Sequence, residues 1–118
     1  MGKNPVTTCL KFMEAWKKRD WKKLLKCCQI TWVRDGHPTV TAVEWLDAWF
    51  SMAAPDKWSV ISTKNITETV VDVSLSVIFH NKKIRKTKLI RVICETDSYT
   101  PSVDGSWGVN PISCLRSE

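Results

Sequence analysis

No apolar run in this sequence comes near the roughly 20 residues that a membrane-spanning helix needs. The N-terminus also lacks the apolar core of a signal peptide. We therefore expect a soluble, cytoplasmic protein, although the mature part of an exported precursor would look the same. Repeats, linkers and low-complexity stretches are absent, and 118 residues suit one ordinary domain. The expected organisation is a single domain over residues 1–118.

The sequence has no cluster of histidine and cysteine with the spacing of a metal site. Its two histidines, His37 and His80, match no such pattern, so we expect no metal ion and no cofactor. Cysteines at apolar positions usually behave as small hydrophobic residues, which predicts buried free thiols. A disulfide or a redox role is the alternative. The five cysteines are Cys9, Cys27, Cys28, Cys94 and Cys114.

Negative charge is in deficit, since 12 Asp and Glu stand against 18 Lys and Arg, for a formal net charge of +6. The positive excess gathers between residues 11 and 26 and again between residues 82 and 91. Such clusters can bind phosphate backbones, but the solvated faces of a helix pair and a hairpin explain them as well. The chain has no known nucleic-acid motif and no aromatic pair placed on a strand for stacking on RNA. Nucleic acid is therefore the least favoured partner.

Two helical segments are predicted before residue 29. Asn4 can cap the first, with Pro5 in its first turn. Asp20 can cap a short second helix. Apolar residues recur at helical spacing in both, and we expect these stripes to face the core. They are Val6, Cys9, Leu10, Met13 and Trp16 in the first, and Trp21, Leu24, Leu25 and Cys28 in the second.

The rest of the chain is expected to add one strand, one helix and then an antiparallel meander. A short strand is predicted over residues 29–34, and a capping-box pattern at Thr41 and Glu44 opens a third helix that ends near Pro55. From Trp58 the apolar period changes to two, which is typical of strands. Helices that precede strands in this way predict an α+β fold with helices on one sheet face. The meander strands are expected over residues 58–63, 71–80, 84–96 and 107–115.

Alternation along these strands predicts which side chains face the core. Apolar residues at every second position from Val71 to Phe79 should point one way. The mixed face that carries Ser74, Ser76 and Ile78 is then open. On the following strand we expect Arg91, the lone fixed cation between Leu89 and Ile93, to point inward.

Residues 12–16 (Phe-Met-Glu-Ala-Trp), 19–21 (Arg-Asp-Trp) and 106–109 (Ser-Trp-Gly-Val, after an Asp-Gly turn) carry a family resemblance. With the order of the elements, they make nearly the whole chain resemble the nuclear-transport-factor-2-like superfamily, also called cystatin-like α+β. The resemblance implies a strongly curved, cone-shaped sheet with a pocket, and a homodimer through the open sheet face. Seven tryptophans could fill the cone or line its pocket. The expected pocket residues are Phe12, Trp16, Trp32, Trp49, Arg91 and Trp107.

Ketosteroid isomerase and its polyketide-cyclase-like relatives in this superfamily keep a carboxylate general base at the end of the first strand. Asp35 looks like the match to that base. The resemblance places Phe12 where the isomerase has an oxyanion-binding tyrosine, and Arg91 near its second, protonated aspartate. Phe12 has no hydroxyl and the charge of Arg91 is fixed, so both oxyanion donors are missing. One such donor is typically worth about a hundredfold in rate, so we predict no appreciable isomerase activity.

These observations favour a non-catalytic pocket domain that binds a small ligand, anionic or apolar, or a protein partner. One alternative is a small isomerase-like, cyclase-like or hydrolase-like enzyme in which Asp35 is the general base and Arg91 holds an anionic substrate. The other alternative is a basic accessory domain that binds nucleic acid. In the plain structural interpretation, Asp35 caps the turn beside Gly36, and Arg91 pairs with Asp35 or Glu95.

Overall fold

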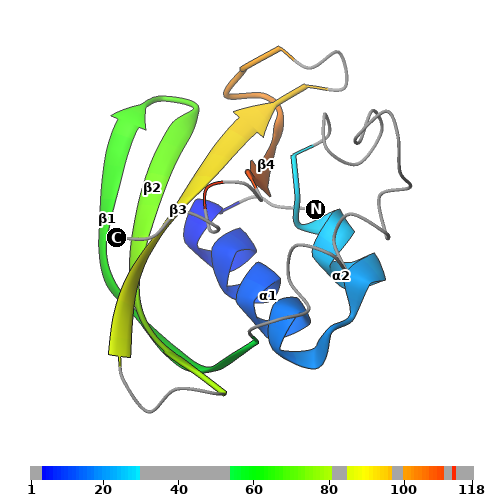
Figure 1. Cartoon of the computed structure of the whole chain (residues 1–118). Coiled ribbons are helices and arrows are strands. Elements are labelled where there is room, and N and C mark those ends of the chain that lie inside the picture. Colours follow the sequence, from blue (N-terminus) through cyan, green and yellow to red (C-terminus); the bar gives the residue numbers. More distant parts are fainter. Residues whose placement is uncertain (1–3, 30–53, 81–84, 97–99, 111–112, 114–118) are drawn as a thin grey trace.

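The computed structural model of the chain describes residues 4–29, 54–80, 85–96, 100–110 and 113. Two helices precede four strands, and the helices lie on one face of the sheet (Figure 1). This is the predicted α+β class. The expected strand at 29–34 falls outside the described residues beyond Gln29, and so does the expected third helix up to residue 53. The elements are α1 (Pro5–Lys18), α2 (Trp21–Lys26), β1 (Pro55–Thr67), β2 (Val70–Phe79), β3 (Arg85–Glu95) and β4 (Ser106–Val109).

Both helices begin at the caps that the sequence predicts. The side chain of Asn4 accepts hydrogen bonds from the backbone N–H groups of Val6 at 2.9 Å and Thr7 at 3.2 Å. The side chain of Asp20 accepts from the backbone N–H of Lys23 at 3.3 Å. Each cap satisfies N–H groups that have no partner inside the helix, which typically stabilises a helix by about 1 kcal/mol.

Arg19 joins the two helices through a left-handed backbone, with φ 54° and ψ 36°. Its N–H donates to Trp16 O, and the N–H of Asp20 donates to Ala15 O. A left-handed residue after the last helical turn is a common helix terminator, although glycine adopts it at lower cost. The chain therefore reverses sharply, and α2 runs back alongside α1 (Figure 1).

The sheet has the strand order β1-β2-β3-β4, and every neighbouring pair is antiparallel. β2 and β3 form the predicted hairpin. β1 is longer than predicted, because its pairing with β2 runs from Pro55↔Phe79 to Thr67↔Val70 across three irregularities in the register. The sheet is not closed, and Figure 1 shows its long strands bending around the side that carries α1.

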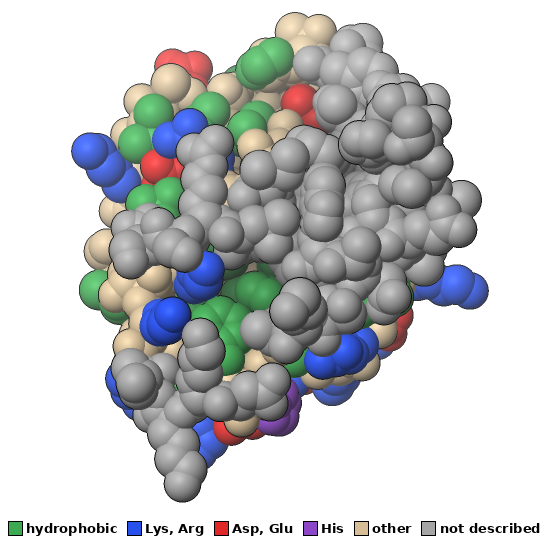
Figure 2. Space-filling view, in the orientation of Figure 1, with side chains coloured by type: hydrophobic (Ala, Val, Ile, Leu, Met, Phe, Trp, Pro, Cys, Tyr) green, Lys and Arg blue, Asp and Glu red, His purple; other side chains and the backbone are tan. Residues whose placement is uncertain are grey.

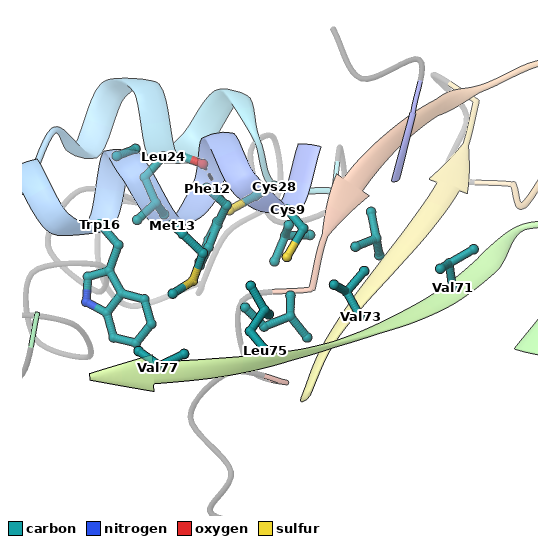
Figure 3. Packing of buried hydrophobic residues seen from close by; sticks show 14 of the residues in the cluster. Cys9, Phe12, Met13, Trp16, Leu24, Cys28, Val71, Val73, Leu75 and Val77 are labelled. Atoms are coloured by element: carbon teal, nitrogen blue, oxygen red, sulfur yellow. Dashed lines mark hydrogen bonds between the residues drawn. The ribbon is translucent and has the colours of Figure 1, made fainter. Parts of the chain in front are cut away.

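The core fills the space between α1 and the sheet (Figure 3). Phe12 and Trp16 meet edge to face with ring centroids 6.3 Å apart, and Trp16 meets Phe79 in the same way at 5.7 Å. The sheet contributes the predicted apolar face of β2. Burial of Trp16 is thus confirmed, whereas Trp107 is half-buried and packs against the edge of this core. Fully buried core residues include Cys9, Phe12, Met13, Leu24, Val73, Leu75, Val77, Ile90, Val92 and Val109.

The chain after α2 lies beside β4. Cys28 forms a parallel bridge with Val109, and the N–H of Gln29 donates to Val109 O at 3.0 Å. A Cβ atom at Gly108 would stand 2.6 Å from the backbone nitrogen of Gln29, which is too close for any side chain. Gly108 therefore allows the segment after α2 to reach the sheet, which fixes where α2 lies against α1.

Candidate functional site

A groove of about 560 Å³ runs between the outer faces of α1 and α2. Sites for small ligands usually enclose about 300–1,000 Å³, so the groove has room for one. Its floor includes Thr8 and Ala15, which are 3% and 4% exposed. The described residues that line it are Asn4, Thr7, Thr8, Lys11, Glu14, Ala15, Lys18, Asp20, Lys23, Lys26 and Cys27.

Polar residues on one face of α1 form one wall of the groove. Thr7, Lys11, Glu14 and Lys18 follow each other at intervals of three or four residues, so they share one face of the helix. The apolar stripe with Phe12 occupies the opposite face and enters the core. Because the chain reverses at Arg19, the polar face of α1 lies beside α2, and its side chains remain exposed.

Two acidic residues in the groove already have partners. The Glu14 carboxylate forms an ion pair with Lys18, one turn further along the same helix, with 3.2 Å between Glu14 Oε1 and Lys18 Nζ. Both side chains are more than half exposed, so this pair adds little to stability. Asp20 uses one carboxylate oxygen as the cap of α2. Neither acid neutralises the remaining lysines.

Three lysines of the groove have no acidic partner among the residues that the structure describes. In the part of the chain that the structure describes, no carboxylate lies within ion-pair distance of Lys11, Lys23 or Lys26. All three lysines are exposed. Their apolar stems can cover the walls of the groove while their ammonium groups reach its opening. The groove therefore combines a partly buried floor with a positive rim.

Cys27 closes one end of the groove as a half-buried free thiol. Burial raises the pKa of this thiol, and the positive charge of Lys11 partly offsets that rise by lowering the pKa. Lys11 and Cys27 both line the groove. A thiol with a raised pKa is protonated at neutral pH, so Cys27 is not an activated nucleophile.

Only some of the residues that the sequence groups in one pocket lie among the described residues. Phe12 and Trp16 lie inside the core, on the face of α1 opposite the groove. Trp107 lies at the edge of the core. Asp35, Trp32 and Trp49 lie outside the described residues, so their placement in a pocket stays a prediction.

The prediction that Arg91 points inward is wrong. In β3 the buried hydrophobic residues are Ile90, Val92 and Cys94, at every second position, and Arg91 lies on the other face of the sheet, away from Phe12 and Trp16. Its guanidinium binds Asp72 on β2 rather than Glu95, and the other expected partner, Asp35, lies outside the described residues. The hydrogen bond to Asp72 is the main reason that the pKa of Arg91 is raised. Apolar residues on both faces of β3 hid the true orientation from the sequence.

The sequence also gave no sign of a buried hydrogen bond between Gln29 and Glu95. The Gln29 side chain donates to a Glu95 carboxylate oxygen at 3.3 Å, and the two residues are 8% and 4% exposed. They are 66 positions apart in the chain, so no local pattern links them. This contact joins the segment after α2 to β3 and lies away from the groove lining.

The described residues show no metal site and no membrane span. Among them, no three His, Cys, Asp or Glu side chains come together as ligands for a metal ion. No helix within the described ranges is both long and apolar enough to cross a membrane. Cys9, Cys28 and Cys94 are buried thiols outside any disulfide, as predicted, whereas the Cys27 thiol is half-buried, and Cys114 lies outside the described residues.

Neither protein-family models, nor curated proteins, nor solved structures include a match to this chain. A positive groove of ligand size can hold an anion, and none of its described residues has the environment of an activated base or nucleophile.

Proposed function

We propose that this protein is a non-catalytic pocket domain that binds a small anionic ligand in the groove between α1 and α2. The single observation that carries the proposal is the set of three lysines, Lys11, Lys23 and Lys26, that line a groove of about 560 Å³ and have no acidic partner among the described residues. Charge-assisted hydrogen bonds are about twice as strong as neutral ones, so such a rim selects anions.

The lining residues support binding rather than catalysis. A general base needs a free carboxylate, imidazole or amine with a pKa near the working pH. Glu14 is paired with Lys18, Asp20 caps α2, and burial keeps the Cys27 thiol protonated. The enzyme alternative depends on Asp35, which lies outside the described residues and stays a prediction.

A charge-reversal experiment tests the proposal. Small carboxylates, phosphate esters and apolar ligands are screened by thermal shift against the wild type, Lys11→Glu and Lys64→Glu. Lys64 is exposed on β1, outside the groove, so its reversal changes the net charge equally. We expect at least one anion to raise the unfolding temperature of the wild type and of Lys64→Glu but not of Lys11→Glu. Equal responses of all three proteins, or no response to any anion, would reject the proposal.

We also propose that the finer architecture is a nuclear-transport-factor-2-like cone that forms a homodimer. The helices cover one face of the sheet, and the long strands bend around α1. The other face carries Ser74, Ser76 and Ile78, all half-buried, which suits contact with a second copy. Light scattering should give twice the chain mass of 13.5 kDa, and a monomer at high concentration would contradict the dimer.

The nucleic-acid alternative has less support. Proteins that bind nucleic acid usually present a continuous basic patch or stripe. Figure 2 shows the molecule in the orientation of Figure 1. On the described part of the face in view, Lys and Arg side chains, in blue, lie at several separate places. The positive groove between α1 and α2 is a local feature of ligand size instead.

A further inference from the structure

We infer that the ligand of the groove is a small phosphate ester whose organic part carries hydroxyl groups. The inference rests on the proposed function, since it names the ligand class of the same groove. Three features of the lining carry it: the type of cation, the placement of charge along the groove, and the state of the helix N-terminus.

The cations favour a phosphate over a carboxylate. Every positively charged side chain among the described lining residues is a lysine, and there are four: Lys11, Lys18, Lys23 and Lys26. Arginine presents a planar fork that matches a planar carboxylate, whereas lysine acts as a compact point charge. A tetrahedral phosphate accepts hydrogen bonds in several directions, so separate ammonium groups from two helices can converge on it.

Charge is distributed unevenly along the groove. Because α2 runs back beside α1, the middle of α1 is level with the end of α2 (Figure 1). Lys11, in the middle of α1, and Lys26, in the last turn of α2, both line the groove beside Cys27, so two lysines without an acidic partner among the described residues gather at this end. The ligand phosphate is therefore placed between Lys11 and Lys26.

The other end of the groove is mixed in charge. Glu14 and Lys18 form their ion pair there, and Asp20 stands at the start of α2. Ionised carboxylates only accept hydrogen bonds, so they suit ligand groups that donate them, such as hydroxyl groups. A ligand with phosphate at one end and hydroxyl groups at the other satisfies both ends of the groove.

The N-terminus of α1 does not supply the anion site. Asn4 already accepts the N–H groups of Val6 and Thr7. Anion binding at a helix start depends on such N–H groups being available. The affinity should therefore depend on the lysine side chains, which makes it testable by substitution.

Glucose 6-phosphate, inorganic phosphate and citrate are the probes, measured by titration calorimetry at constant ionic strength. We expect glucose 6-phosphate to bind the wild type, and inorganic phosphate and citrate each to bind about tenfold more weakly or worse. The double variant Lys11→Gln/Lys26→Gln should weaken glucose 6-phosphate binding by about tenfold or more. The control Lys57→Gln/Lys64→Gln removes two positive charges from exposed positions on β1 and should bind as the wild type does.

The outcomes separate this inference from the proposed function. Citrate that binds as well as glucose 6-phosphate, with the same dependence on Lys11 and Lys26, overturns the phosphate ester and leaves an anion site. Failure of every probe to bind overturns both. Equal loss in the two double variants, at unchanged unfolding temperature, shows attraction by net charge alone and rejects the site. A short single-stranded oligonucleotide that binds far more tightly than glucose 6-phosphate, with steep salt dependence, assigns the lysines to nucleic acid instead.

Discussion

Arg91 donates two hydrogen bonds to Asp72, from Nε to Oδ1 at 2.8 Å and from Nη2 to Oδ2 at 3.0 Å. The two residues face each other across β2 and β3, on the side of the sheet away from α1. The Asp72 side chain is 9% exposed, whereas that of Arg91 is 43% exposed. This pair places Arg91 on the face of the sheet away from α1, outside the described lining of the helix groove.

Removal of either partner should destabilise the fold, but unequally. Arg91→Met leaves a mostly buried carboxylate without its donor, which should lower the free energy of unfolding by about 1–2 kcal/mol. Asp72→Asn leaves a guanidinium that water can reach, so its cost should stay below about 1 kcal/mol. Urea unfolding followed by circular dichroism measures both. Neither change should alter ligand binding, and loss of anion binding in Arg91→Met alone would return Arg91 to the site.

Lys11 should control the reactivity of Cys27. Because the charge of Lys11 lowers the pKa of the thiol, Lys11→Gln should raise that pKa further and reduce the thiolate fraction. Alkylation of Cys27 by iodoacetamide between about pH 8 and 9 should then be slower than in the wild type. Peptide mass spectrometry can follow the modification of Cys27 separately from that of the buried Cys28. Lys64→Gln is the matched control, and an equal slowing there would show that net charge, not proximity, acts on the thiol.

Cys9 should make the fold lose stability at alkaline pH. Burial raises the pKa of its thiol to about 12, from an ordinary value of 9.0. Above pH 9.0 the unfolded chain releases this proton while the folded chain keeps it, up to about pH 12. The stability from Cys9 is therefore complete below pH 9.0 and is lost as the pH rises toward 12. The slope is at most about 1.4 kcal/mol per pH unit.

Comparison with Cys9→Ala isolates this effect, because every other titratable group is the same in the two proteins. The wild type should be the more stable at pH 8, where Cys9 fills its place in the core. The difference in the free energy of unfolding should then shrink as the pH rises above 9.0. A difference that stays constant with pH would show that the Cys9 thiol ionises as easily in the folded chain as in the unfolded one.

Local signals made the helices predictable from the sequence. Asn4 and Asp20 cap helices through contacts within three residues, so the sequence alone shows where each helix begins. β2 was equally clear, because only one of its faces is strongly apolar, from Val71 to Phe79. Its burial pattern follows the expected alternation, with the addition of Asp72, which is buried against Arg91.

Non-local contacts explain what the sequence missed. β3 has apolar residues on both faces, so alternation could not decide whether Leu89 or Ile90 points to the core. Its orientation follows from pairing with β2, which sets Arg91 opposite Asp72. The groove was missed for a related reason. The lysines of residues 11–26 looked like solvated faces, and only the reversal at Arg19 turns the two faces toward each other.

The most direct test of the central claim is to locate ligand binding on the chain. Two-dimensional amide NMR spectra of the isotope-labelled protein are recorded during titration with glucose 6-phosphate and, separately, with citrate. If the groove between α1 and α2 is the ligand site, at least one titration shifts the amide signals of Lys11, Lys23 and Cys27 in a saturable manner. Signals of Ser74 and Arg91, on the far face of the sheet, should move little. Saturable shifts confined to that far face, or no saturable shift with either probe, would contradict the account.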